Sequence, residues 1–228
     1  MSPLRAVLLD AGGTLFVERR PRPRMYADVA RRHGLACDEA AIGRAMAEVH
    51  AALPVRAGGG FRYTRPWFER FIAEVFARAG APALPPGVAP DLFDAFANAA
   101  SFRVFDEVPP LLEKLRRAGL RLAVVSNWSP TLDALLDGLG LASRFDAVVS
   151  SGRAEVEKLV PGIFTLALAR LGVPAEAALH VGDDRVKDFE GARAAGLRAA
   201  LLDRSGRDAS AWSTLAPLAD LVDGNPPG

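Results

Sequence analysis

The sequence is poor in cysteine and lysine, and both shortages limit what the protein can be. A single cysteine, Cys37, excludes a disulfide within the 228 residues and fits a reducing compartment. Arginine carries nearly all the positive charge, since the only lysines are Lys114, Lys158 and Lys187. The formal net charge is +1, with no basic tail and no Lys/Arg block. We therefore expect no nucleic-acid partner.

Long apolar runs are also missing. No segment approaches the roughly 20 apolar residues that span a bilayer, and residues 1–10 lack the pattern of a signal peptide. We expect a cytoplasmic protein without a membrane partner; its oligomeric state is open. Half of the residues are apolar, so the chain can bury a sizeable core in one large domain, or in a main domain with a smaller companion.

Short apolar runs alternate with helical patterns in the second half of the chain. The expected strands are residues 5–10, 121–126, 147–150, 178–181 and 198–202, and the expected helices are 109–118, 130–139, 161–171 and 186–195. Repeated strand–helix units predict a parallel sheet with helices on both faces. The fold class is therefore α/β, with a Rossmann-like, doubly wound core.

An interruption separates the first strand from the rest of this pattern. Residues 25–100 show helical spacing and no evident strand, which predicts a small all-helical unit. We expect a core made of residues 1–16 and 101–228, and an inserted helical domain of residues 17–100.

Polar side chains follow three of the predicted strands. Asp10 and Thr14 follow the first strand, Ser126 and Asn127 end the second, and Asp183 with Asp188 follows the fourth. The carboxyl ends of parallel strands meet at one edge of the sheet, so these groups should converge. Taken singly, each has a common structural explanation, such as a turn or a helix cap.

The combination points to chemistry on a phosphate group. Asp10 with Asp183 or Asp188 forms a cluster of carboxylates, which repel one another unless a cation lies among them, and oxygen ligands suit Mg²⁺. Lys158 and the Ser126 hydroxyl supply a positive charge and a donor for a phosphoryl group. A carboxylate that attacks phosphorus forms an aspartyl-phosphate.

Four motifs resemble those of the haloacid dehalogenase-like (HAD) hydrolase superfamily over essentially the full chain. They are DAGGTL at 10–15, VVSN at 124–127, Lys158, and HVGDDRVKDFEGARAAG at 180–196. The resemblance implies Asp10 as nucleophile, Thr14 as a positioning residue, and phosphate binding by Ser126, Asn127 and Lys158.

The same resemblance implies a metal site and a mobile cap. The metal is Mg²⁺, held by Asp10, the main-chain carbonyl of Gly12 and a fourth-motif acid; Asp183 and Asp188 are the acids of this metal site. The helical domain between the first two motifs corresponds to the family's cap, which covers the substrate.

Gly12 departs from the family pattern. Most phosphatases of this family carry an aspartate there, which protonates the leaving group and later activates water. A second departure follows Lys158. In the family a proline commonly comes directly after this lysine, whereas here Leu159 and Val160 stand between Lys158 and Pro161. We expect a Mg²⁺-dependent hydrolase of a small phosphorylated metabolite, slow or suited to an activated leaving group.

Two other functions stay open. A catalytically weak protein could bind a phosphorylated metabolite on a retired hydrolase scaffold. Alternatively, Asp10 could displace halide from carbon, which needs neither a metal nor a leaving-group acid. Trp128 fits pocket lining and core packing equally well, whereas packing is the expected role of Phe61, Tyr63 and Trp67.

Overall fold

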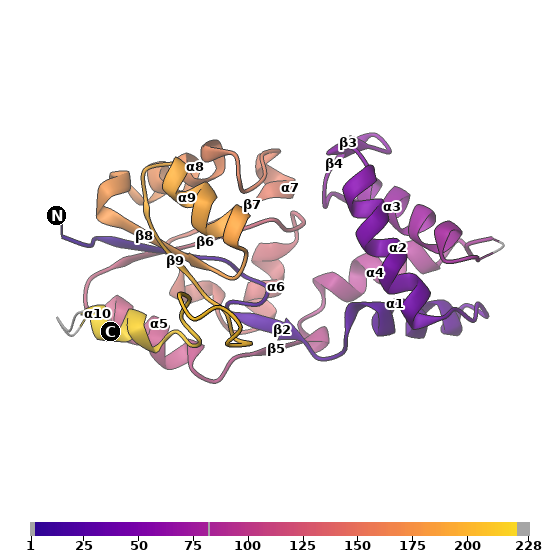
Figure 1. The fold of residues 1–228 in the computed structure, drawn as a ribbon, viewed down its shortest axis with the longest axis horizontal. Coiled ribbons are helices and arrows are strands. Elements are labelled where there is room, and N and C mark those ends of the chain that lie inside the picture. The colour runs from indigo at the N-terminus through magenta and orange to yellow at the C-terminus, as the bar shows by residue number, and fades with distance from the viewer. Residues whose placement is uncertain (1–2, 82, 223–228) are drawn as a thin grey trace.

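A five-stranded parallel sheet forms the centre of the larger of two bodies in this computed structural model, which describes residues 3–81 and 83–222 (Figure 1). Its strands are β1 (Ala6–Leu9), β6 (Arg121–Ser126), β7 (Ala147–Ser150), β8 (Ala178–Gly182) and β9 (Arg198–Leu201). The order is β7-β6-β1-β8-β9, and every neighbouring pair is parallel. The chain turns from one side of β1 to the other, which confirms the doubly wound α/β fold.

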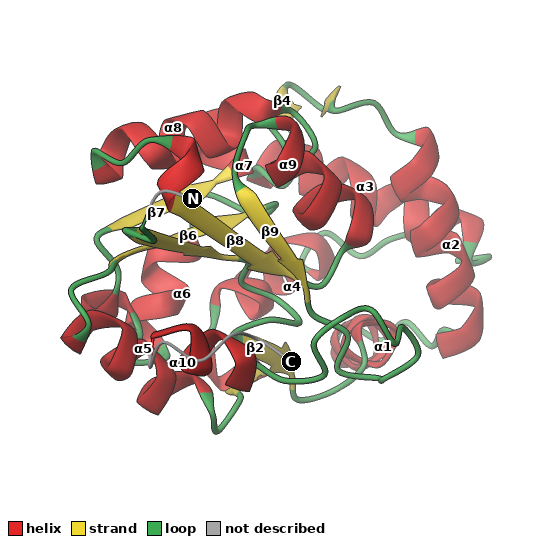
Figure 2. Ribbon diagram, turned by 60° about the vertical axis from the view of Figure 1, so that its left-hand side comes forward, coloured by secondary structure: helices red, strands yellow, loops and turns green. Residues whose placement is uncertain are grey.

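Helices cover both faces of the sheet, because the strands are apolar on both sides (Figure 2). Val7 and Leu9 of β1 pack with α5 (Val108–Arg117), α6 (Leu132–Gly138) and α10 (Ala216–Val222). Ala6 and Leu8 pack with α8 (Pro161–Leu171) and α9 (Gly191–Ala194) on the other face. The α8 helix has the predicted bounds, with Pro161 at its start and Gly172 in the left-handed conformation after its end.

The smaller body, which we call the cap, has a core of its own. It consists of α1 (Arg22–Arg32), α2 (Glu39–Ala52), α3 (Arg65–Arg78) and α4 (Val88–Ala97), packed around rings such as Tyr26, Trp67 and Phe76. The expectation of an all-helical cap was wrong in one detail. A short hairpin joins β3 (Arg56–Ala57) to β4 (Gly60–Phe61). Gly58 and Gly59 both have positive φ, 60° and 82°, which a tight hairpin turn requires.

A pair of antiparallel strands that the sequence did not predict leads from the core to the cap (Figure 1). They are β2 (Phe16–Glu18) and β5 (Phe102–Val104), each too short to show a hydrophobic period. One-turn 3₁₀ helices cover 99–101, 142–144 and 175–177, and α7 (Ser151–Ala154) is equally short. None of the helices in the described part of the chain is long and apolar enough to cross a bilayer.

Candidate active site

Asp10 lies immediately beyond the central strand β1, where the sheet order reverses. Its amide donates to the carbonyl of Val181 at 3.0 Å, so the residue continues the β1–β8 pairing, and its side chain is buried. Gly13 has φ +77°, and a Cβ there would lie 2.1 Å from Oδ2 of Asp183. Glycine is required at position 13 because it combines a left-handed backbone with close approach to an acid from the neighbouring strand end.

Lys158 joins two of these acids. Its Nζ donates to Oδ1 of Asp10 and, at 2.6 Å, to Oδ1 of Asp188. Its own amide donates to Oδ1 of Asn127 at 2.7 Å, which fixes the loop before α8 to the end of β6. Burial lowers the pKa of Lys158, but the charges of Asp10 and Asp188 outweigh it and raise that pKa above its usual value. The lysine is therefore a fixed positive charge at the sheet edge.

Asp188 is held by three donors. Besides Lys158, Nε2 of His180 lies 3.0 Å from its Oδ1, and the amide of Asp184 donates to its Oδ2 at 3.0 Å. Burial raises its pKa, but Lys158 and His180 more than compensate, so that pKa lies below its usual range. Asp188 is thus a buried anion that orients the lysine.

The chain around Asp188 departs from the predicted helix 186–195. Residues Arg185–Glu190 form a wider, π-helical turn, and regular α-helix follows only at α9. Asp184 caps this turn by accepting from the amides of Val186 and Lys187. The wider turn brings Asp188 back against Gly182, where an added Cβ would lie 2.3 Å from its carboxyl carbon.

Three carboxylates meet at this edge: one oxygen from each of Asp10, Asp183 and Asp188 lies within 4.8 Å of the others. Asp183 is the exposed member. Its pKa is raised to about 7, first by the partial burial of its carboxylate and then by the charges of Asp10 and Asp188. One lysine faces three acids, and oxygen donors are the ligands that Mg²⁺ prefers. The donor set therefore fits a divalent cation.

The other predicted site residues come from the same strand ends. Ser126 is buried at the end of β6, beside β1, and its neighbour Asn127 holds the Lys158 loop as described above. Thr14 is fully buried, and its Oγ1 has no hydrogen-bond partner among the described residues. Gly12 lies in the loop between Asp10 and Gly13. The convergence expected from the strand order is thus present in the structure.

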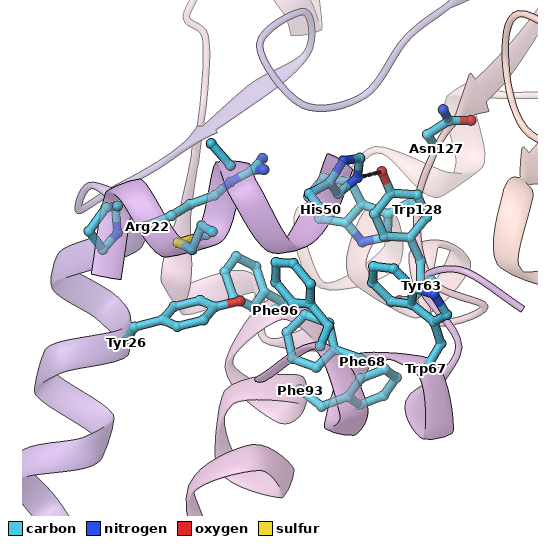
Figure 3. A pocket seen from close by; sticks show the side chains of 16 residues that line it. Arg22, Tyr26, His50, Tyr63, Trp67, Phe68, Phe93, Phe96, Asn127 and Trp128 are labelled. Atoms are coloured by element: carbon cyan, nitrogen blue, oxygen red, sulfur yellow. Dashed lines mark hydrogen bonds between the residues drawn. The ribbon is translucent and has the colours of Figure 1, made fainter. Parts of the chain in front are cut away.

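A cavity of about 440 Å³ lies between the cap and this edge of the sheet (Figure 3). Trp128 lines it from the core and also packs edge-on against Phe16. Both roles that the sequence left open for Trp128, pocket lining and core packing, therefore apply.

Cap residues form most of the cavity wall. Tyr63 and Trp67 line the cavity, whereas Phe61 is not among its lining residues. Sequence reasoning missed the lining residues Arg22, His50 and Phe96, because the face of a cap helix that meets the cavity is set by tertiary packing.

A polar pair marks the cavity wall. Nε2 of His50 lies 3.1 Å from the hydroxyl of Tyr63, the contact drawn in Figure 3. The pKa of His50 is lowered to about 4 by partial burial and by the positive charges of Arg62, Lys187 and Arg22. His50 is therefore neutral at pH 7.

Comparison with known proteins agrees with this geometry. The haloacid dehalogenase-like hydrolase family matches residues 4–196. The chain belongs to the haloacid dehalogenase-like hydrolases. It is 32% identical over 244 residues to haloacid dehalogenase-like hydrolase domain-containing protein 3 of Mus musculus, covering 98% of this chain and 97% of that protein.

Two further HAD relatives carry more specific descriptions. The chain is 38% identical over 141 residues to a phosphoserine phosphatase of Thermus thermophilus, covering 61% of this chain and 55% of that protein. It resembles the solved structure of an L-2-haloacid dehalogenase from Xanthobacter autotrophicus with a TM-score of 0.68 and 25% identity, covering 97% and 84% of the two chains. Both phosphorus and carbon chemistry thus occur on related scaffolds.

Proposed function

We propose that the protein is a Mg²⁺-dependent phosphatase that hydrolyses small phosphate monoesters through an aspartyl-phosphate on Asp10. The observation that carries the proposal is the meeting of Asp10, Asp183 and Asp188 around a single lysine. Such an excess of negative charge is explained by a bound cation, which displacement of halide from carbon does not need. The phosphoserine phosphatase relative supports the same choice.

The metal would be held by Asp10, the carbonyl of Gly12 and Asp183, with Asp188 bound directly or through water. When bound, Mg²⁺ neutralises charge on the phosphoryl oxygens and orients them. Ser126 and Asn127, at the end of β6, would bind the remaining phosphate oxygens together with Lys158. Residues 17–100 would act as the cap over this site.

In the first step the phosphoryl group would pass from the ester to Asp10. Lys158 holds Oδ1 of Asp10, which leaves Oδ2 as the attacking oxygen. A bond forms between Oδ2 and phosphorus while the ester P–O bond breaks, and the leaving oxygen departs with the electron pair. Since Gly12 offers no acid, that oxygen takes its proton from water. Water then attacks phosphorus and the Oδ2–P bond breaks, while a proton from that water neutralises the hydroxide left by the first step; phosphate is released and the Asp10 carboxylate is restored.

Gly12 also favours a second candidate, the displacement of halide from a haloacid by Asp10. A halide leaves without protonation, so the missing acid is no handicap there. The carboxylate oxygen would form an ester with the substrate carbon, halide would leave, and water would then release the hydroxy acid. This reaction gives no reason for the clustering of Asp183 with Asp10.

One set of measurements separates the two candidates. We expect release of phosphate from para-nitrophenyl phosphate that requires Mg²⁺, disappears in Asp10→Asn, and is accompanied by calorimetric Mg²⁺ binding that Asp183→Asn weakens severely. Halide release from haloacids with equal rates with and without EDTA would instead establish the dehalogenase. Tight binding of phosphate compounds with no turnover of either kind would show a binding protein on a hydrolase scaffold.

A further inference from the structure

The cavity under the cap is unusually aromatic for a site that would receive small polar metabolites. Half of its lining residues are Phe, Tyr or Trp: Tyr26, Tyr63, Trp67, Phe68, Phe71, Phe93, Phe96 and Trp128. Figure 3 shows Phe68, Phe93 and Phe96 gathered on one side of the cavity. Its volume, about 440 Å³, is roughly three times that of an apolar cavity known to hold one benzene ring. The space suits a flat apolar group of one or two rings.

This cavity lies beside the reacting centre, although Asp10 and Lys158 are not among its lining residues. Asn127 and Trp128, which line it, directly follow Ser126. A Cβ on Gly12, two residues from the nucleophile, would lie 3.1 Å from Cζ3 of Trp128. Asn127 in turn holds the amide of Lys158, whose Nζ binds Asp10. A phosphate placed at Asp10 would therefore direct its ester group toward the aromatic walls.

The polar side chains that line the cavity include no acid. No Asp, Glu or Lys lines it; the charged residue is Arg22, whose guanidinium is paired with Glu18 at 2.5 Å. His50 is neutral and engaged with Tyr63. An ammonium group on a substrate would find no carboxylate among the lining residues, so its charge would lose water without a partner of opposite charge. The lining therefore disfavours amino-acid phosphates, whose ammonium group would be left without a counter-charge.

From these observations we infer that the substrate is an aryl phosphate, with its ring bound between the cap aromatics and Trp128. The inference deepens the proposed phosphatase function and rests on it. It also accounts for Gly12, because a phenolate, with the pKa of about 10 typical of a phenol, leaves without a general acid far more readily than an alkoxide. The apolar cavity and the missing acid thus fit the same substrate.

Binding tests the cavity apart from catalysis. We expect 1-naphthylphosphonate, which is not hydrolysed, to bind to the Mg²⁺-loaded protein at least about tenfold more tightly than methylphosphonate in calorimetry. Ala47 lines the cavity from α2 yet is exposed, so Ala47→Phe fills space without disturbing the core. Ala51→Phe, also exposed on α2 but outside the cavity, is the matched control.

We expect Ala47→Phe to weaken naphthylphosphonate binding about tenfold, with methylphosphonate unaffected and Ala51→Phe like the parent protein. In turnover, kcat/KM for 1-naphthyl phosphate should exceed that for glycerol phosphate by at least about 100-fold. Equal affinity for the two phosphonates, insensitivity to Ala47→Phe, or a preference for glycerol phosphate would overturn the aryl assignment while leaving a phosphatase. Selective naphthylphosphonate binding without turnover of any phosphate ester would overturn the phosphatase, and the cavity assignment would stand.

Discussion

The ring of Trp128 covers the backbone of Gly12. A Cβ at Gly12 would lie 3.1 Å from Cζ3 of Trp128, closer than an ordinary van der Waals contact. Gly12 is not among the residues with positive φ, so its backbone accepts a side chain. The tryptophan, and not the conformation of the loop, therefore opposes an aspartate at position 12, where the resemblance to HAD phosphatases implies a general acid.

We predict that the acid can be restored if Trp128 is reduced at the same time. Gly12→Asp combined with Trp128→Phe should raise kcat/KM for an alkyl phosphate by about 10- to 100-fold, and for para-nitrophenyl phosphate by less. A positioned acid is worth about 10²–10⁴-fold, and an introduced one is held less well. Steady-state kinetics on both substrates measure the difference.

The control for this experiment is Gly12→Asn with Trp128→Phe, which matches the shape of aspartate without its proton. Gly12→Asp alone should gain less than the double variant, because the tryptophan must move. Equal gains in the Asn and Asp variants would show that Gly12 is not a missing acid.

Lys158 should contribute much more to the unfolding free energy than a lysine that pairs with an acid at the surface. Lys158→Met leaves Asp10 and Asp188 buried without their cation, and we expect a loss of about 3–5 kcal/mol of unfolding free energy. Lys187→Met removes an exposed pair with Asp184 and should cost less than about 1 kcal/mol. Urea denaturation of both variants checks this; similar losses would contradict the buried network.

Magnesium binding should depend on pH through Asp183. Its pKa of about 7 means that a proton competes with the metal below neutrality. Mg²⁺ affinity should fall up to about tenfold for each pH unit below 7 and level off above about 8. Calorimetric titrations between pH 5.5 and 8.5 measure this, and Asp183→Asn should remove the dependence along with most of the affinity. Constant affinity across the range would exclude Asp183 as the titrating ligand.

His50 should lower the stability of the protein in mild acid. Its pKa is about 4 in the folded chain and about 6.5 when unfolded, so the unfolded chain binds more protons between these values. Neutral His50 therefore makes its full contribution to the unfolding free energy above pH 6.5. That contribution is lost as the pH falls toward 4. We expect about 1–2 kcal/mol, after allowing for partial exposure to solvent. Thermal unfolding of His50→Gln should show a correspondingly weaker loss of stability over this pH range; parallel curves would contradict the assignment.

An ion pair from the cap should hold the loop that carries Lys158. Arg62, mostly buried, lies 3.4 Å from Glu157, and its guanidinium also donates to the carbonyl of Leu53 at 3.0 Å. Glu157→Gln should loosen the cap and raise KM about 3- to 10-fold, with faster hydrogen exchange in residues 53–64. Glu155→Gln, which breaks the exposed pair with Arg56, should change KM less than about twofold. Equal effects would show that neither pair restrains the cap.

Short apolar runs, and the residues at which they end, determined the core of this protein. The strands 121–126 and 147–150 and the helix 161–171 have the predicted bounds, because they are buried on one face or two and end at glycine, proline or polar residues. Parallel strands deliver their ends to one edge, so the meeting of Asp10 with Asp183 and Asp188 followed from the order of motifs.

Only the tertiary structure decided where the shortest elements form and which side chains line the cavity between the cap and the core. The strands β2 and β5 have three residues each, and their pairing joins segments more than 80 residues apart, which no local pattern records. Within the π-helical turn, Asp188 contacts Lys158 and His180, which lie outside that turn, and no local pattern records these contacts. Whether an aromatic residue on a cap helix faces its own core or a cavity depends on how the cap lies against the sheet edge. For that reason the sequence showed that position 12 carries no acid, and only the structure showed that the ring of Trp128 lies against the place where a side chain at that position would begin.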